Sequence, residues 1–525
     1  MSLMDIETID NAVIGSGPAG VAAARALLEL GLPVTILDAG RELPVAAAKL
    51  QAQLAGSEPE AWDEGTLEAL RNAGPEDHGD VPLKRLFGSE HSYHFDSRVN
   101  ADDASILGSF ARGGLSNVWG AAIMPFSDSD TCNWPISVAE LAPHYEAVLD
   151  WMPHAQREDD LTQRFPLYST RRQPLRLSRQ AQALRDDLSN ARSRLSDAGI
   201  SFGQARLAID GCRYCGMCMH GCPWDAIYKA SDTLDDMIKN RSLYYQGGTV
   251  VESIVERDDH IELGVNANGN RRMIRAERVY LGTGVLNTAM LLYPLLGRPE
   301  FRIRDTAYLI IPFVRFRNTA DVQQEHLQTL AQLFTEVTNP SISSRNIHLQ
   351  WYSYNDLYTT ELRRMTGLAY PALRPFLNRW LLGRLWTAQA FFHSEDSHVI
   401  SMKSVNDGRA FRLSRINNPR TSIVTKGLLG MLWRYRRDFG GIALGFARRE
   451  GLPGRGFHAG ASLPMAAQPG PLESDVYGRP AGLHRVHVID ASVLPTLPAA
   501  TVTLTVMANA HRIASQFHEY GNGNA

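Results

Sequence analysis

One stretch near the amino terminus, residues 11–40, constrains the fold of this chain more than any other. It reads NAVIGSGPAGVAAARALLELGLPVTILDAG, which predicts an apolar strand, a glycine-rich turn, an alanine-rich helix and a second strand that ends at Asp38. Gly15, Gly17 and Gly20 give the GxGxxG spacing, which permits a tight turn, close approach of a pyrophosphate and close helix packing. The helix N-terminus would face the phosphates, and Asp38 would accept hydrogen bonds from a ribose. The stretch predicts a Rossmann-like dinucleotide site, with a plain tight turn as the alternative.

The composition is that of an ordinary globular protein. The chain has 525 residues, 44% of them hydrophobic and 21% charged, and its net charge of -3 gives no reason to expect a nucleic-acid partner. A secretory signal has a basic region followed by an apolar run, whereas the first residues here, MSLMDIETID, carry acids. We therefore expect no secretory signal in this segment. No uncharged apolar run reaches the roughly 18 residues needed to span a bilayer. We therefore expect a cytoplasmic protein, with peripheral membrane contact as an option.

Four of the five cysteines fall in one segment, GCRYCGMCMHGCPWDAIYKA, at Cys212, Cys215, Cys218 and Cys222. Such clustering favours a metal or cluster site in a reducing compartment over a disulfide framework. With Pro223 the spacing is C-x2-C-x2-C-x3-C-P, the run of bacterial ferredoxins, in which thiolates bind iron and backbone amides point at the sulfurs. We expect an iron–sulfur cluster, 3Fe-4S or 4Fe-4S. The alternatives are a structural zinc ion or buried thiols that bind nothing.

The fourth cysteine of the run leaves a choice of ligands. In a ferredoxin the last cysteine of such a run serves a second cluster, but this chain has no second run. Either Cys222 joins one local cluster, or Cys132 supplies a ligand from elsewhere in the fold.

The region from 300 to 455 is the candidate substrate domain. RFRNTADVQQEH, NIHLQWYSY and SHVISMKSVNDGRAFRLSRI predict antiparallel strands, with Asp407-Gly408 as a hairpin turn. Two stretches, 371–392 and 426–449, mix arginines with leucines and tryptophans at helical spacing. Basic amphipathic segments can lie on an anionic membrane surface or dock an acidic electron carrier. Helices that pack their apolar face on the substrate domain would have the same pattern.

Several segments outside the dinucleotide motif resemble the glucose-methanol-choline (GMC) oxidoreductases. ARGGLSNVWGAAIMPF, which begins at Ala111, is similar to the second flavin-contacting segment of the family, in the branch of bacterial sugar and polyol dehydrogenases. Some relatives attach FAD covalently through a histidine here, and the matching residue is Val118, so the resemblance implies noncovalent FAD. The flavin contacts that it implies are Gly113, Gly114, Ser116 and Trp119.

Two more segments carry the same resemblance. ERVYLGTGVLNTAMLLYPLLG looks like the family's strand–glycine–helix element beneath the adenosine end of FAD, which implies contacts at Gly282 and, from the preceding strand, at Val250. Some sugar dehydrogenases of the family carry a three-iron cluster on a cysteine segment followed by CP, and CPWDAIY is similar to it, although the cysteine spacing differs. The resemblance thus covers the cysteine segment as well as the flavin site.

The C-terminal segment resembles the closing motifs of the family. FHAGASLPM places His458 at the catalytic histidine, which accepts the hydroxyl proton as the adjacent C–H gives hydride to flavin N5. Asp490, which ends VHVID, matches the acid that anchors the ribityl or pyrophosphate region. Thr501 stands where the family has Asn or His, and because threonine is no base, His458 is the only base expected. The helix that begins near Thr501 would point its positive end at the flavin.

The resemblance implies an α/β fold with a Rossmann-like FAD-binding domain, of the GMC and p-hydroxybenzoate hydroxylase type, and a discontinuous α+β substrate domain on an antiparallel sheet. The FAD-binding domain is expected to comprise residues 1–145 with flavin loop 111–126, residues 206–310 with the cysteine segment, and residues 456–525. The substrate domain is expected to comprise a helical region at residues 146–205 and the sheet region at residues 311–455.

The implied function is that of an FAD-dependent dehydrogenase. It would oxidise a hydroxyl group of a sugar, polyol or other alcohol, and the cluster would pass electrons to an acceptor protein or a quinone. A cluster favours a dehydrogenase over an oxidase, because oxygen needs no such relay. Two alternatives are a flavin/iron–sulfur reductase of a C=C or C=O bond, and a zinc-stapled flavoprotein without a relay.

Overall fold

The glycine-rich stretch lies at the centre of a seven-stranded sheet. The computed structural model describes residues 7–72, 83–240 and 243–520. The strand order is β5-β2-β1-β8-β7-β6, with β18 also beside β8. The parallel neighbours are β1 (Glu7–Ile14), β2 (Val34–Leu37), β5 (Tyr244–Gln246), β8 (Asn270–Leu281) and β18 (Val486–Val488). The antiparallel neighbours of β8 are β7 (Ile261–Ala267) and, beyond it, β6 (Thr249–Glu256).

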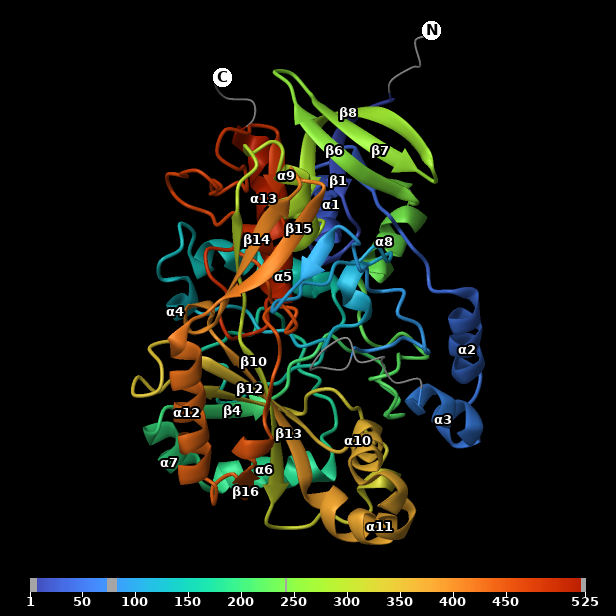
Figure 1. Cartoon of the computed structure of the whole chain (residues 1–525), viewed down its shortest axis with the longest axis vertical. Coiled ribbons are helices and arrows are strands. Elements are labelled where there is room, and N and C mark those ends of the chain that lie inside the picture. Colours follow the sequence, from blue (N-terminus) through green and yellow to red (C-terminus); the bar gives the residue numbers. More distant parts are fainter. Residues whose placement is uncertain (1–6, 73–82, 241–242, 521–525) are drawn as a thin grey trace.

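Helix α1 (Pro18–Glu29) follows the turn after β1, as predicted. Its alanines are buried, because α1 is covered by α13 (Thr503–Tyr520), and α13 is covered in turn by α5 (Val138–Trp151). A β-carbon on Gly20 would lie 1.9 Å from the Gly15 carbonyl oxygen, so only glycine lets the helix approach the turn this closely. Helices α8 (Ala230–Lys239) and α9 (Val285–Leu292) complete the first domain (Figure 1).

A second sheet, of antiparallel strands, lies below the first domain in Figure 1. Its order is β16-β10-β13-β12-β11-β4, with β17 also beside β10. One face packs on α6 (Arg179–Asn190) and α12 (Pro419–Arg434) through an apolar core that includes Trp351 and Trp386. The strands are β4 (Ile200–Gln204), β10 (Tyr308–Arg315), β11 (Leu333–Val337), β12 (Ile347–Tyr352), β13 (Leu385–Phe392), β16 (Gly441–Ala443) and β17 (Arg449–Glu450).

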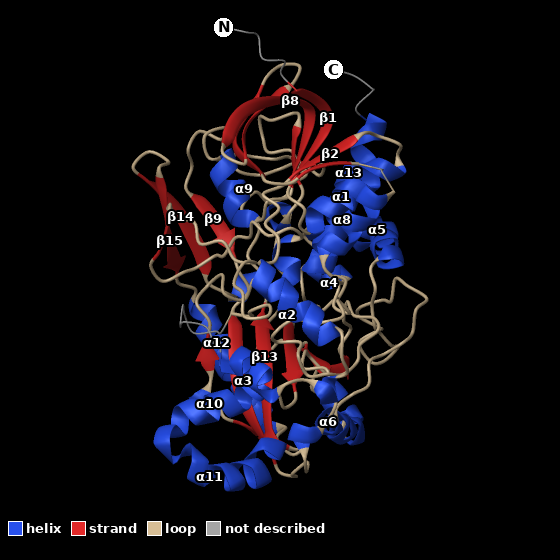
Figure 2. Cartoon of the chain, turned by 90° about the vertical axis from the view of Figure 1, so that its right-hand side faces the viewer, coloured by secondary structure: helices blue, strands red, loops and turns tan. Residues whose placement is uncertain are grey.

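A smaller sheet flanks the first domain (Figure 2). Its strands, in order, are β3 (Val99–Ala101), β15 (Ala410–Ile416), β14 (Val399–Val405) and β9 (Phe301–Arg304). The predicted hairpin at Asp407-Gly408 joins β14 to β15, and both turn residues have positive φ. The remaining α-helices are α2 (Val45–Ala55), α3 (Glu64–Asn72), α4 (Asp128–Thr131), α7 (Arg192–Asp197), α10 (Asp356–Thr366) and α11 (Tyr370–Phe376).

The predicted fold class is confirmed, and three local predictions are wrong. RFRNTADVQQEH is mostly loop, because β10 ends at Arg315. The stretch 371–392 is helical only as far as Arg384, and Leu385–Phe392 is strand β13, paired with β10 on one side and β12 on the other. The stretch 426–449 likewise leaves the helix at Arg434 and enters β16. In Leu385–Phe392, hydrogen bonding to a strand on each side outweighs the helical spacing of a few leucines. In the described portion of the chain, no helix is long and apolar enough to cross a membrane.

Candidate flavin and substrate site

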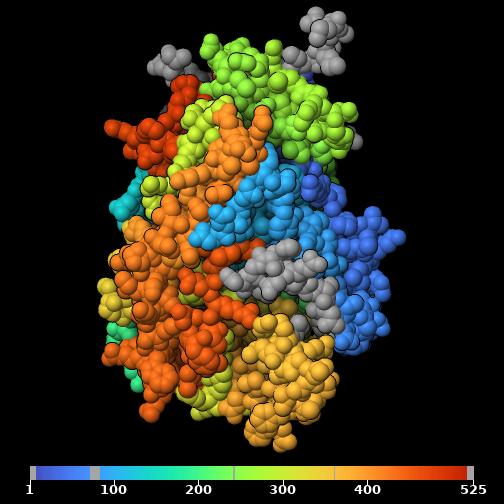
Figure 3. Space-filling model, viewed as in Figure 1, coloured from blue at the N-terminus to red at the C-terminus, as the bar shows by residue number. Residues whose placement is uncertain are grey.

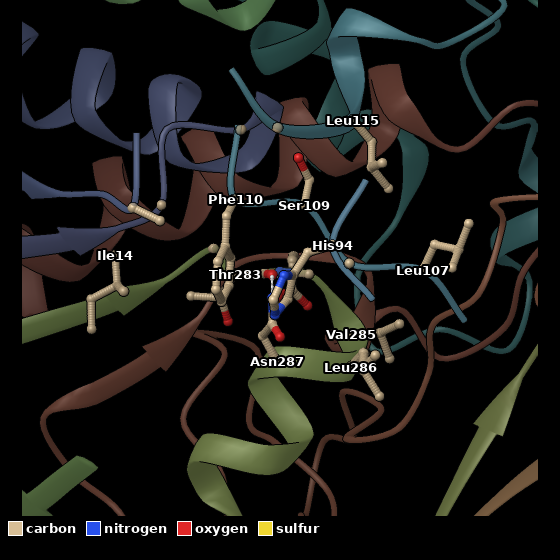
Figure 4. Close-up of a pocket in the computed structure, with 18 of the residues that line it drawn as sticks. Ile14, His94, Leu107, Ser109, Phe110, Leu115, Thr283, Val285, Leu286 and Asn287 are labelled. Atoms are coloured by element: carbon tan, nitrogen blue, oxygen red, sulfur yellow. Dashed lines mark hydrogen bonds between the residues drawn. The ribbon is translucent and has the colours of Figure 1, made fainter. Parts of the chain in front are cut away.

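A cavity of about 750 Å³ lies at the carboxyl ends of the parallel strands (Figure 4). This is the edge at which open α/β sheets bind nucleotides. The cavity brings together predicted cofactor residues from five separate segments: Gly15, Gly17, Asp38, Gly114, Val250, Gly282 and Asp490. Its size is that of a small-molecule or cofactor site. His94 and Phe110, which no motif marked, also line it, with their rings stacked at a centroid distance of 3.8 Å.

The dinucleotide turn is held by a serine inside the fingerprint. Gly15 has φ +95°, and a β-carbon there would lie 2.9 Å from the carbonyl oxygen of Gly282, so the tips of β1 and β8 almost touch. Ser16 Oγ donates to Asp38 Oδ2 at 2.5 Å and accepts from the Gly113 amide at 2.9 Å. Burial raises the pKa of Asp38, whereas the hydrogen bond from Ser16 lowers it. Ser16 thus connects Asp38, the acid predicted to bind the ribose, to the flavin loop.

Five predicted flavin or cofactor contacts do not line the cavity within the described residues: Gly20, Gly113, Ser116, Trp119 and Thr501. Ser116 Oγ donates to the Gly113 carbonyl at 2.5 Å and accepts from the Ala230 amide at 2.9 Å. Trp119 Nε1 donates to the Tyr228 carbonyl at 2.9 Å. These bonds fasten the flavin loop to the start of α8. The predicted direct contact of these residues with the flavin stays a prediction, and the structure adds that Ser116 and Trp119 support the loop from its other side through these hydrogen bonds.

Asp490 joins three segments at the cavity edge. Its Oδ2 accepts from the Gly284 amide at 2.9 Å and from Thr288 Oγ1 at 2.5 Å, and its Oδ1 accepts from the Ser492 amide at 2.9 Å. Burial raises the pKa of this carboxyl, and these hydrogen bonds lower it. Because α9 begins directly after Gly284, the carboxylate also lies at a helix N-terminus.

His458 and Thr501 are each next in the chain to residues that line the cavity, but neither lines it. Phe457 and Ala459, on either side of His458, line the cavity, as do Val502 and Thr503, which lead from Thr501 into α13. His458 Nδ1 and Thr501 Oγ1 are buried and make no hydrogen bond within the described residues. Burial lowers the pKa of His458 to about 4, with a smaller effect from His348. The imidazole is therefore neutral at neutral pH and can accept a proton.

A buried pair with no sequence motif lies near this histidine. His348 Nδ1 is 2.5 Å from Glu336 Oε1, Asn346 Nδ2 also donates to Glu336, and both members of the pair are fully buried. They project from β12 and β11 onto the face of the second sheet that carries Phe391, opposite the apolar core. The Phe391 ring centroid lies 5.0 Å from that of His458 and 6.3 Å from that of His348. The two partners become neighbours only when the strands pair, so no local pattern in the sequence marks them.

We expect Glu336→Gln to lower the free energy of unfolding by about 3 kcal/mol, because an amide cannot accept from both His348 and Asn346, and a buried donor is left without its partner. Urea denaturation of the FAD-loaded protein measures this. The matched control is Glu395→Gln, whose partner Arg345 is 2.8 Å away in a partly exposed pair. That change should cost about 1 kcal/mol or less. Equal losses in the two variants would contradict the special role of the buried pair.

The four cysteines of the 212–222 run lie beside the flavin loop. Cys222 lines a cavity of about 330 Å³ together with Arg112 and Asn117 of that loop. Three sulfurs accept backbone amides: Cys212 from Tyr214 at 3.4 Å, Cys222 from Ala226 at 3.2 Å and Cys218 from Thr329 at 3.5 Å. Burial raises the pKa of Cys212 and of Cys215 to about 12, and the neighbouring thiols add to this. Among the described residues, no group of three or more His, Cys, Asp or Glu side chains has the arrangement of a metal site.

Cys132 is not a member of this group. It is exposed at the end of α4, and its Sγ lies 3.9 Å from Arg345 Nη1. The alternative in which Cys132 supplies an outside ligand stays a prediction, which this contact with Arg345 does not support.

The cavity at the strand ends of the first sheet and the separate antiparallel sheet form an arrangement that can be compared with known proteins. Residues 445–510 match the family model described as GMC oxidoreductase, and this range contains His458, Asp490 and Thr501. No curated protein matches the chain significantly. A solved structure with a similar fold is pyridoxine 4-oxidase from Mesorbium loti, with a TM-score of 0.58 at 15% identity over 97% of this chain and 99% of that chain. The family match covers the C-terminal segment alone, and the likeness to pyridoxine 4-oxidase over the whole chain is a likeness of fold.

Proposed function

We propose that this protein is a GMC oxidoreductase, an FAD-dependent dehydrogenase that oxidises the hydroxyl group of a sugar, polyol or other alcohol. The observation that carries the proposal is the place of His458, which is buried between two residues that line the cavity and lies within the segment that matches the GMC family model. A neutral, buried base next to a cofactor cavity suits removal of a hydroxyl proton. The buried Oγ1 of Thr501 offers one hydrogen bond that could orient the same hydroxyl.

The residues around the cavity fit noncovalent FAD. The Gly15–Gly17 turn and the N-terminus of α1 would hold the pyrophosphate, Asp38 the ribose, and the N-terminus of α13 the flavin end. Val118 stands where some relatives have the histidine that attaches FAD covalently. It is an apolar residue packed against Leu83 and Leu107. When bound, FAD supplies the hydride acceptor. The chain's own residues orient the hydroxyl, remove its proton at His458 and exclude water with aromatic side chains such as Phe391.

We propose further that Cys212, Cys215, Cys218 and Cys222 hold an iron–sulfur cluster that relays electrons to a protein or quinone acceptor. Four clustered thiols with backbone amides donating to the sulfurs support this proposal. Lys84 links the two sites, because Nζ donates to the Trp119 carbonyl at 3.5 Å. Lys84 also lines the cavity of about 330 Å³ together with Cys222. Burial lowers the pKa of Lys84, whereas Cys218 and Cys222 raise it.

A second candidate is an oxidase, in which oxygen takes the electrons directly. It is favoured by the fold shared with a protein that is named an oxidase. The same cysteines would then hold zinc or no metal. A reductase of a C=C or C=O bond uses the same residues with electrons flowing inward.

Substrate-driven reduction of the flavin under anaerobic conditions, combined with metal analysis, tests these proposals. We expect sugars, polyols or secondary alcohols to bleach the flavin absorbance, and roughly three or four irons with acid-labile sulfide per flavin. Turnover should be faster with a quinone or ferricyanide than with oxygen. Hydrogen peroxide formation with zinc or no metal would establish the oxidase instead, and flavin that no alcohol bleaches would overturn alcohol oxidation.

A further inference from the structure

We propose that the end of the molecule farthest from the dinucleotide sheet docks on an anionic phospholipid surface. This end, called here the basic–apolar end, comprises the α10–α11 region to Arg384, the loop 316–319 after β10 and the segment 433–440 after α12. It lies at the bottom of Figure 1 and carries α11 as its tip in Figure 2. The proposal is independent of the reaction proposed above.

Large apolar side chains at this end face solvent. The exposed fractions are 103% for Leu368, 61% for Phe376, 50% for Trp380, 56% for Trp433 and 47% for Phe316. These residues come from three segments of the chain. Hydrogen bonds between the segments hold them side by side in one surface. The Phe316 amide donates to the Gly440 carbonyl at 2.9 Å, and Asn318 Nδ2 donates to the Arg379 carbonyl at 3.2 Å.

Arginines lie between these apolar side chains without acidic partners. Arg317, Arg374, Arg379, Arg434 and Arg437 are exposed, and none of them forms an ion pair with a carboxylate within residues 7–72, 83–240 and 243–520. The sequence has no acid between Glu361 and Glu395. Elsewhere on this protein most exposed arginines pair with acids, as Arg271 does with Glu252. The unpaired charge at this end favours an anionic partner.

The mixture of side chains favours a lipid surface over a protein. The Arg379 guanidinium lies 5.5 Å from the centre of the Trp380 ring, and that of Arg436 lies 4.6 Å from the centre of the Trp433 ring. Tryptophan with an adjacent arginine is typical of the membrane–water interface, where the ring enters the headgroup layer and the guanidinium meets phosphates. Protein interfaces instead gather apolar residues in a central patch with charges at the rim. The space-filling view shows the α10–α11 region as a projecting tip, which can reach a flat surface (Figure 3).

Flotation of the full-length, FAD-loaded protein with vesicles tests the proposal. We expect it to float with vesicles of phosphatidylcholine and phosphatidylglycerol, and to be released by high salt. The double variant Arg374→Glu/Arg379→Glu should lower binding at least about tenfold, because each basic residue near an anionic surface adds to the attraction. Phe376→Ser/Trp380→Ser should lower it as well, through loss of apolar insertion. Arg379→Lys should keep it.

The matched control is Met273→Ser/Arg275→Glu, which makes the same kinds of change on exposed residues of β8 at the opposite end of the molecule. It should float like the unaltered protein. All variants should retain FAD, which shows that they fold. Absence of flotation with anionic vesicles, or equal binding to pure phosphatidylcholine, would overturn the proposal. It would also be overturned by a dimer that forms without lipid and is broken by the Arg374 and Arg379 changes.

Discussion

Replacing His458 with alanine is expected to slow anaerobic reduction of the flavin by substrate about 10³-fold, the usual loss when a general base is removed. The reason is that His458 lies within the C-terminal match and between two residues that line the cavity, whereas Thr501 cannot remove a proton. FAD should stay bound, because the cofactor residues belong to other segments. Single-turnover stopped-flow spectroscopy measures the rate of flavin reduction. An unchanged rate would show that His458 does not act as the base.

The pH dependence of that rate separates a base from a structural histidine. Because burial lowers the pKa of His458 to about 4, the neutral and active form dominates above that pH. The rate should be level from neutral pH down to about 5 and should fall as the pH drops through about 4, and the alanine variant should lose this limb. His487 is a matched control. It is buried too, and burial lowers its pKa to about 4, but its ring stacks on Tyr280 in the first sheet. His487→Asn should affect stability and leave the limb in place.

Replacing Cys218 with serine is expected to abolish electron delivery to a quinone or ferricyanide while substrate still reduces the flavin. Iron should fall from roughly three or four per flavin to none, because a serine oxygen is a poor ligand for a thiolate cluster. Metal analysis and electron paramagnetic resonance measure the iron. Flavin reduction by substrate and electron delivery to the acceptor are measured separately.

Cys132→Ser serves as the control, since Cys132 is exposed and lies next to Arg345. It should keep iron and turnover. If Cys218→Ser retained full acceptor activity, the relay would be wrong even if the protein contained metal. If both half-reactions failed together, the cysteine segment would serve the fold of the flavin loop instead.

The features predicted from sequence are those set by neighbours along the chain. The turn from Gly15 to Gly20, the cysteine run and the Asp407-Gly408 hairpin each depend on a few consecutive residues. The cavity lining at Val250, Gly282 and Asp490 followed from resemblance, because those residues sit on elements whose order the family shares. The structure brings them together at the same strand ends.

What the sequence did not predict depends on contacts across the fold. Glu336 and His348 meet only across paired strands, and Ser16 reaches Asp38 and the Gly113 amide only once the flavin loop folds back. Ser116 and Trp119 are also bound to the backbone near α8, a contact that no motif predicted. Leu385–Phe392 continues a stretch with leucines at helical spacing, yet two neighbouring strands make it a member of a sheet.

The first sheet contains strands from both ends of the chain. β1 begins at Glu7, whereas β18 comes from Val486–Val488, and α13 is the cover of α1. During synthesis, the emerging chain therefore carries an open sheet edge and an uncovered, alanine-rich helix until β18 and α13 have been made. The residues Asp490, Val502 and Thr503, which form one wall of the cavity, belong to the same late segments. A chain that stops before Val486 therefore has no complete cofactor cavity, however well its first strands fold.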